Sequence, residues 1–190
     1  LAVYPPDGHV RVAVPEHETD ENIRLAVISK LGWIKRQQRD FSDQARQSER
    51  QYVSGECHYS LGKRCRFELI ERAGKHEVKL LQSGKLKMFV KPGTSVAGKE
   101  KLLHGWYRAQ LKIQVPKLLE KWQPIIGEHV DEYGIKKMKT KWGSCNIEQR
   151  RIWLNLELAK KSPECLEYIL VHELVHLLER NHNDRFKGHM

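Results

Sequence analysis

The segment HELVHLLERNH, residues 172–182, combines three histidines and a glutamate at a spacing that suits a metal ion. On an α-helix, positions four apart lie on one face, so His172 and His176 can point at the same ion. Glu173 then lies about 100° round the helix, within reach of a water molecule on that ion. Hydrolytic zinc sites use three protein ligands and leave a fourth position open. The spacing therefore predicts a metal centre that includes His172 and His176.

His182 is the candidate for the third ligand. It follows His176 by six residues, beyond a helix end that we expect within residues 179–181. There Asn181 could adopt a left-handed conformation and reverse the chain. This spacing equals that of the metzincin motif, although Glu179 replaces its glycine and Met190 comes too early for a Met-turn. The ordinary alternative is a solvated stripe of a helix, but this helix is strongly apolar, and burying a glutamate there without a partner is costly.

Other residues near the motif have two readings. Residues 142–145, WGSC, could line a cleft, or they could serve as a packing and turn device. Arg185 and Asn181 could orient the ligands or polarise a carbonyl, or they could form an exposed salt bridge and a helix cap. Phe186 is expected to bury its ring and anchor the segment that carries His182.

Capping and periodicity predict the elements that position these residues. Ser162 and Pro163 open the helix that carries the motif. Residues 95–127 have apolar positions at helical spacing, and Pro116 and Pro124 are expected to break or kink that helix. A strand pair is predicted between the two helices, with a first arm in YGIKKMKTKWGSC, a turn in NIEQRR and a second arm in RIWLNLEL. The predicted buried face of the first helix consists of Leu102, Leu103, Trp106, Leu111, Ile113, Leu118, Leu119 and Trp122.

The first half of the chain alternates in the manner of strands. Residues 9–16 predict one half-buried strand. A helix is predicted to follow, with Thr19 or Asp20 as its cap and apolar positions that extend to Ile34. Residues 35–50 form its polar continuation. Apolar alternation between residues 65 and 90, interrupted by turns at AGK and SGK, predicts three strands of a small antiparallel sheet. The predicted fold is α+β, with a β-rich region over residues 1–93 and a second region over residues 94–190.

Composition narrows the class of protein. No apolar run approaches the ~20 residues that cross a bilayer, and the first residues lack a signal-peptide pattern, so we expect a cytoplasmic protein without membrane association. The four cysteines, Cys57, Cys65, Cys145 and Cys165, form no C-x-x-C pair, so nitrogen and carboxylate ligands are expected at any metal. A net charge of +10 favours phosphate-rich partners or reflects solvated lysines, and nucleic-acid association stays open.

A family resemblance extends over most of the chain. The segments KTKWGSC, RIWLNLEL, HELVH and NHNDRF, together with YSLGKRCRFELI, resemble the YgjP-like predicted metal-dependent hydrolases, relatives of the SprT and WLM zinc peptidases. The resemblance implies that His172, His176 and His182 bind Zn²⁺ and that Glu173 is the general base. It also implies a zincin-like core, in which an antiparallel edge strand beside the motif helix receives an extended peptide. The chain departs from the family at Lys187, where members often have tryptophan.

Three functions are compatible with these residues. The first is a zinc metallopeptidase that acts on peptides or proteins. The second is a metal-dependent nucleotide phosphohydrolase or pyrophosphatase, although that chemistry commonly uses clustered carboxylates and Mg²⁺. The third is a DNA-associated protease or binding module similar to SprT, for which no helix-turn-helix or zinc-finger motif is present. The sequence leaves the oligomeric state and the substrate undefined.

Overall fold

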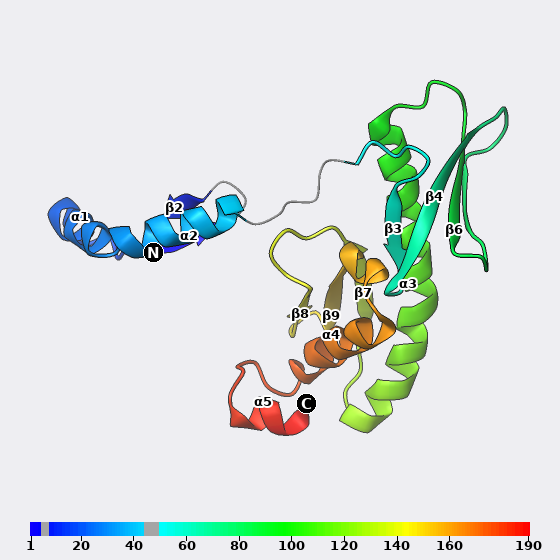
Figure 1. Cartoon of the computed structure of the whole chain (residues 1–190). Coiled ribbons are helices and arrows are strands. Elements are labelled where there is room, and N and C mark those ends of the chain that lie inside the picture. The colour runs from blue at the N-terminus through cyan, green and yellow to red at the C-terminus, as the bar shows by residue number, and fades with distance from the viewer. Residues whose placement is uncertain (5–7, 44–49) are drawn as a thin grey trace. The chain divides into compact units, whose positions relative to one another are not determined.

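Figure 1 shows the computed structural model of the chain, which describes residues 1–4, 8–43 and 50–190. Contacts divide the chain into two compact units, Leu1–Arg50 and Gln51–Met190. Helices and strands are mixed in both units, so the predicted α+β class is confirmed. Within the described residues, no helix is both long and apolar enough to cross a membrane.

The first unit contains a two-stranded antiparallel sheet and two helices. Its elements are β1 (Ala2–Tyr4), β2 (His9–Arg11), α1 (Asp20–Ser29) and α2 (Leu31–Asp43). Thr19 caps α1, because its hydroxyl accepts a hydrogen bond from the Asn22 backbone N–H at 3.3 Å, as predicted. The strand is shorter than the predicted residues 9–16, and the predicted helix is divided in two at Lys30. Part of the polar continuation, residues 44–49, lies outside the described residues.

A four-stranded sheet opens the second unit. Its strands are β3 (Cys57–Ser60), β4 (Lys63–Glu71), β5 (Glu77–Leu80) and β6 (Lys85–Val90), in the order β3-β4-β6-β5. The sheet is mixed, because β6 runs parallel to β4, and the prediction of a wholly antiparallel sheet is wrong on this point. The reason is burial: Leu86, Met88 and Val90 make β6 the most apolar strand, and an interior position in the sheet buries it best.

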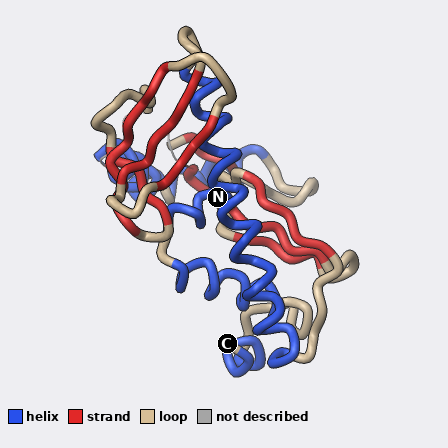
Figure 2. The backbone as a smooth tube through the Cα atoms, turned by 90° about the vertical axis from the view of Figure 1, so that its right-hand side faces the viewer, coloured by secondary structure: helices blue, strands red, loops and turns tan. Residues whose placement is uncertain are grey.

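The long helix α3 (Val96–Ile126) runs along the second unit beside this sheet, as the two views in Figures 1 and 2 show. Ser95 caps its start and Gly127, with φ of +79°, ends it, so the predicted bounds are confirmed. One buried stripe repeats every four residues: Leu103, Tyr107, Leu111, Val115 and Leu119. The predicted buried face is wrong at Ile113, which is 54% exposed.

Two prolines lie inside α3 without ending it. Pro116 and Pro124 are both on the exposed side of the helix, so water can satisfy the carbonyls that lack an N–H partner. The buried stripe on the opposite side packs against the core of the unit. Because this packing holds the helical turns together, the predicted break does not occur.

A three-stranded sheet follows α3 and carries one wall of the site. Its strands are β7 (Glu132–Lys136), β8 (Gly143–Asn146) and β9 (Arg151–Asn155), in the order β7-β9-β8. The predicted antiparallel pair is confirmed for β8 and β9. The prediction of one continuous first arm over residues 133–145 is wrong, because the mostly exposed residues 137–142 leave the sheet and β7 pairs parallel with β9. The buried Asn155 amide donates to the carbonyls of Met138 at 3.0 Å and Lys141 at 2.7 Å. These bonds hold the loop that delivers β8 to the edge of the sheet.

Three short elements complete the chain: η1 (Leu156–Lys160), α4 (Pro163–Val175) and α5 (Asp184–His189). The β3–β4 turn docks on the end of η1, where the Leu61 and Gly62 N–H groups donate to the carbonyls of Ala159 and Lys160. One hydrophobic core is shared by residues of the four-stranded sheet, α3, β9, η1 and α4. The division into domains over residues 1–93 and 94–190 remains a prediction.

Candidate metal centre

The helix α4 presents the first two histidines on one face. Ser162 precedes it and Pro163 occupies its first turn, as predicted. The helix ends at Val175 with His176 as its C-cap residue, several residues earlier than the predicted end at 179–181. The rings of His172 and His176 lie edge to face, with their centroids 5.0 Å apart.

His182 returns to these two rings after a turn. Its Nε2 atom lies 3.0 Å from Nε2 of His172, and one ligand nitrogen from each of the three histidines lies within 4.8 Å of the others. Nitrogen ligands around a tetrahedral zinc ion are about 3.3 Å apart, so the three nitrogens lie near the spacing that such a site requires. The structure thus brings together the three residues that the sequence suggested.

The chain reversal before His182 does not use the predicted left-handed Asn181. Among described residues other than glycine, positive φ angles occur at Tyr52, Leu61 and Arg150. The helix instead ends in a turn in which the Leu178 and Glu179 N–H groups both donate to the Val175 carbonyl, at 3.0 Å. A second, tight turn is centred on His182 and is closed by a hydrogen bond from the Asn183 N–H to the Asn181 carbonyl, at 2.8 Å. Asn183 then caps α5, because its side-chain oxygen accepts from the Phe186 N–H at 3.0 Å.

The Phe186 ring packs against all three imidazoles. Its ring centroid lies 4.9 Å from that of His172, 4.8 Å from that of His176 and 4.7 Å from that of His182. The ring is buried and packs with Val171 and Val175 of α4. The predicted anchoring of the His182 segment by Phe186 is therefore confirmed.

One of the imidazoles is oriented by the backbone. The Nδ1 atom of His176 lies 3.2 Å from the Glu179 carbonyl. When Nδ1–H donates to that carbonyl, Nε2 carries the lone pair, which is the arrangement that a metal ligand requires. Arg185 does not contact a ligand histidine: its side chain is 79% exposed, and its Nε lies 3.8 Å from the carboxylate of the largely buried Glu179 side chain, so the alternative reading of a salt bridge holds.

Glu173 is buried beside the histidines, with 5% of its surface exposed. Burial raises its pKa from an ordinary 4.5 to about 7, and the positive charge of Lys141 opposes this rise only in part. A carboxylate with a pKa near neutrality can both accept and return a proton at physiological pH. Burial also lowers the pKa of His172, and the charges of His176 and His182 add to that effect. The lowered pKa of His172 favours the neutral imidazole, which is the form that binds a metal, and the raised pKa suits Glu173 to proton transfer.

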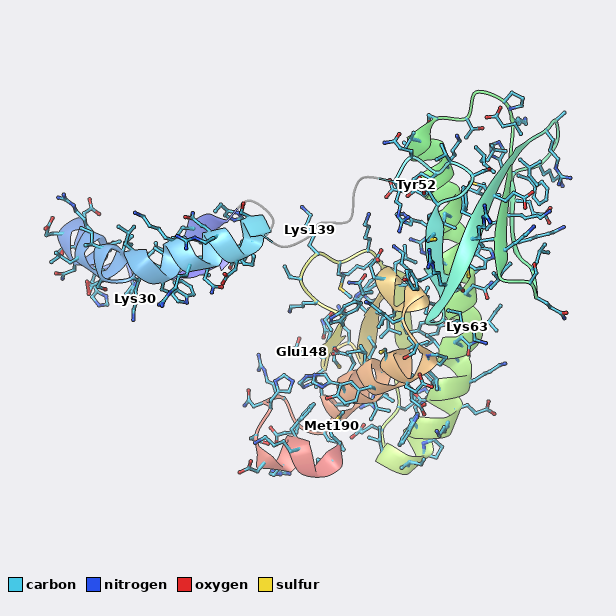
Figure 3. The ribbon with its side chains drawn as sticks, viewed as in Figure 1. Lys30, Tyr52, Lys63, Lys139, Glu148 and Met190 are labelled. Atoms are coloured by element: carbon cyan, nitrogen blue, oxygen red, sulfur yellow. The ribbon has the colours of Figure 1, made fainter. Side chains whose placement is uncertain are left out.

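A cleft of about 800 Å³ joins the histidines to the edge strand β8. The lining residues are Lys141, Gly143, Ser144, Cys145, Asn146, Ile147, Glu148, His172, Glu173, His176, Arg180 and His182. Glu148 is labelled in Figure 3, which shows the surrounding side chains. Of the WGSC segment, residues 143–145 line the cleft, whereas the exposed Trp142 contacts Lys161, whose Nζ lies 5.5 Å from the Trp142 ring centroid.

Sequence reasoning missed three cleft residues with charge, Lys141, Glu148 and Arg180. The position of Lys141 two residues before Gly143 was a usable signal, but Arg180 had no pattern to mark it. Cys145 is not a nucleophile at neutral pH, because burial first and then the charge of Glu173 raise its pKa to about 11, against a smaller opposing effect of Arg150. The cleft therefore offers imidazole nitrogens and a carboxylate for chemistry.

Comparisons with known proteins place this geometry in context. The family model described as "YgjP-like, metallopeptidase domain" matches residues 1–190. Among solved structures, the chain is similar to the crystal structure of the metallopeptidase zymogen of Pyrococcus abyssi abylysin, at 27% sequence identity and a TM-score of 0.37. That match covers 40% of this chain and 74% of the other. No curated protein sequence matches the chain.

Proposed function

The chain belongs to the YgjP-like metallopeptidase family, and on this premise we propose that it is a zinc-dependent peptidase. Membership of the family makes the protein a metal-dependent hydrolase. The observation that supports the finer assignment is the convergence of three imidazoles beside a buried glutamate, in a cleft whose other wall is an edge strand.

The donor set fits zinc. Three neutral imidazoles suit Zn²⁺, and a catalytic zinc site keeps its fourth position for water or substrate. We assign His172, His176 and His182 as the ligands. A zinc ion held there would polarise a substrate carbonyl and lower the pKa of a water molecule.

Glu173 is assigned as the general base. Its buried carboxylate, with a pKa of about 7, accepts a proton from the attacking water. The same group then returns the proton to the leaving amine. Because Glu173 opens onto the cleft, the substrate carbonyl can approach both the histidines and the carboxylate.

The edge strand β8 is assigned to the peptide substrate. It pairs with β9 along one side and is the terminal strand of its sheet, so its other side can pair with an extended peptide. Trp142 and Asn155 form a hydrogen-bonded pair across β8 and β9, because the Asn155 N–H donates to the Trp142 carbonyl at 2.9 Å. In an antiparallel ladder, the backbone groups of Gly143 and Cys145 then point away from β9, towards the open side.

Metal analysis tests the ligand set. Wild-type protein purified without added metal should contain about one zinc per chain, and His182→Ala should lose most of it. The matched control is His104→Ala, which removes a half-buried histidine of α3 outside the cluster. Equal zinc content in wild type and His182→Ala would exclude His182 as a ligand.

Glu173→Gln tests the base. The variant should keep its zinc and lose turnover by at least about a hundredfold on a peptide that the wild type cleaves. Full activity in a metal-loaded sample would overturn the assignment.

Release of phosphate from nucleotides, if it replaced peptide cleavage, would favour a phosphohydrolase. In the described part of the chain, however, no second metal-ligand cluster accompanies the histidines, as two-metal phosphoryl chemistry would need.

A further inference from the structure

The outer face of the four-stranded sheet carries a group of cations remote in sequence from the candidate metal centre. On β4, Cys65 and Phe67 point into the core, so the alternate residues Arg64 and Arg66 point to solvent. Lys85 of β6 is directly opposite Arg66, and Tyr59 of β3 is directly opposite Arg64. We call Tyr59, Arg64, Arg66 and Lys85 the basic face.

Two hollows are present on the basic face, with volumes of about 390 and 440 Å³. Arg66 and Gly55 line both of them. Lys85 lines the first, together with Ser54, and Arg64 lines the second, together with Ser83. Cationic groups and hydroxyls thus surround two adjoining recesses, as in sites that bind phosphate.

The positive charges of the basic face are not neutralised by carboxylates within the described residues. Arg64 donates through Nε and one Nη to the Cys57 sulfur, at 3.1 and 2.8 Å, which holds the guanidinium in place but leaves its charge. Arg66 and Lys85 form no salt bridge in the described structure, and Glu68, the acidic residue in the first hollow, pairs with Lys87 at 3.6 Å. Like charges directly opposite each other destabilise a sheet. An anionic ligand would remove this repulsion.

An aromatic side chain accompanies the cations. Tyr59 is 45% exposed, and its backbone carbonyl is held by the Tyr107 hydroxyl at 2.7 Å. Its ring is therefore anchored to the core at the backbone and available to solvent at the tip. Proteins that bind single-stranded nucleic acid combine a cationic track for the backbone with exposed aromatic rings for the bases.

We propose that the basic face binds single-stranded nucleic acid, with Arg64, Arg66 and Lys85 contacting phosphates and Tyr59 stacking on a base. The net charge of +10 acts in the same direction, because it attracts the polyanion at long range. The proposal is independent of the peptidase activity, since these residues belong to β3, β4 and β6 and none lines the cleft of the histidines.

The test is fluorescence anisotropy with a labelled oligothymidylate of about 20 nucleotides and the full chain at low salt. Arg66→Gln/Lys85→Gln should weaken binding at least about tenfold and reduce the slope of log K against log salt by about 1.4, at roughly 0.7 per phosphate contact. The matched control is Lys112→Gln/Lys117→Gln, which removes two exposed charges from α3 of the same unit. Equal weakening in both double variants, or no saturable binding by the wild type, would overturn the proposal.

Tyr59→Leu separates stacking from charge. It should weaken binding of the oligothymidylate about fivefold or more and leave binding of inorganic polyphosphate unchanged. An equal effect on both polymers, or tighter binding of a duplex than of the single strand, would overturn the assignment of Tyr59 to a base. Thermal unfolding of each variant shows whether a loss of binding reflects a loss of folded protein.

Discussion

The Glu173 carboxylate occupies the space that a side chain at Gly143 would need. A Cβ atom built at Gly143 would lie 2.5 Å from Glu173 Oε1 and 2.7 Å from its Cγ. The glycine of the WGSC segment therefore lets the glutamate of α4 lie flat against the edge strand β8. In the proposed mechanism, Gly143 is a positioning residue for the general base.

Gly143→Ala should displace the carboxylate and lower kcat by at least about tenfold, because misplacing a catalytic group by about 1 Å has effects of this size or larger. Zinc content should stay at the wild-type level, since no metal ligand is changed. Gly105→Ala is the control, because a Cβ atom there would meet nothing within 4 Å. Wild-type kcat in Gly143→Ala would mean that the contact does not position the base.

The burial of Glu173 predicts a pH dependence of stability in metal-free protein. Burial raises its pKa from 4.5 to about 7, so below pH 4.5 the group is neutral in both states, and above pH 7 it is charged in both. Between these values the folded state binds more protons, so the contribution of Glu173 to the free energy of unfolding falls as pH rises. Metal-free Glu173→Gln should thus be more stable than wild type at pH 8, by up to about 3 kcal/mol, and equal to it near pH 4.5. Urea unfolding with a chelator present measures both values, and a difference that is constant with pH would contradict the burial argument.

Phe186 is predicted to control metal affinity without touching the metal. Phe186→Ala removes the ring that all three imidazoles contact, and α5 loses its buried residue. Zinc affinity should fall about ten- to a hundredfold, the range for residues that orient ligands, as measured by competition with a chromophoric chelator. Met190→Ala is the control in the same segment, since that side chain is 41% exposed. Equal zinc affinity in the two variants would show that the Phe186 ring does not hold the histidines in place for the metal.

Gly62, in the β3–β4 turn of the four-stranded sheet, donates its N–H to the Lys160 carbonyl at the end of η1. Substitution of Gly62 is predicted to destabilise the protein. Its φ is +78°, and a Cβ atom would lie 3.0 Å from the Ser162 Cα atom. Gly74→Ala has the strain of a positive φ, here +119°, without any contact within 4 Å. Both variants should be destabilised by about 1 kcal/mol from backbone strain, and Gly62→Ala by a further 1–3 kcal/mol from the clash. Chemical denaturation gives both values, and equal losses would show that the turn can move away from Ser162.

Local features were predictable because they depend on neighbours in the sequence. The helix cap at Thr19, and the facing of His172 and His176, follow from side-chain chemistry and from the period of the helix. The hairpin of β8 and β9 follows from the apolar run of β9 and the polar turn before it, whereas the end of β7 at Lys136 has no such local signal. Local reasoning did not decide the outcome at Pro116 and Pro124, where the helix is not broken because packing on the far side of α3 outweighs two missing hydrogen bonds.

What the sequence by itself determined is the set of chemical groups and the local elements that carry them: three imidazoles, one carboxylate, an apolar helix and an edge hairpin. Only the tertiary structure decided that β6 lies between β4 and β5, that the segment after α4 returns His182 to within 3.0 Å of His172, and that Gly143 makes room for Glu173. The physical reason is the range of the interactions. Capping and helical periodicity act over a few residues, whereas these placements depend on burial and close packing between segments that are distant along the chain.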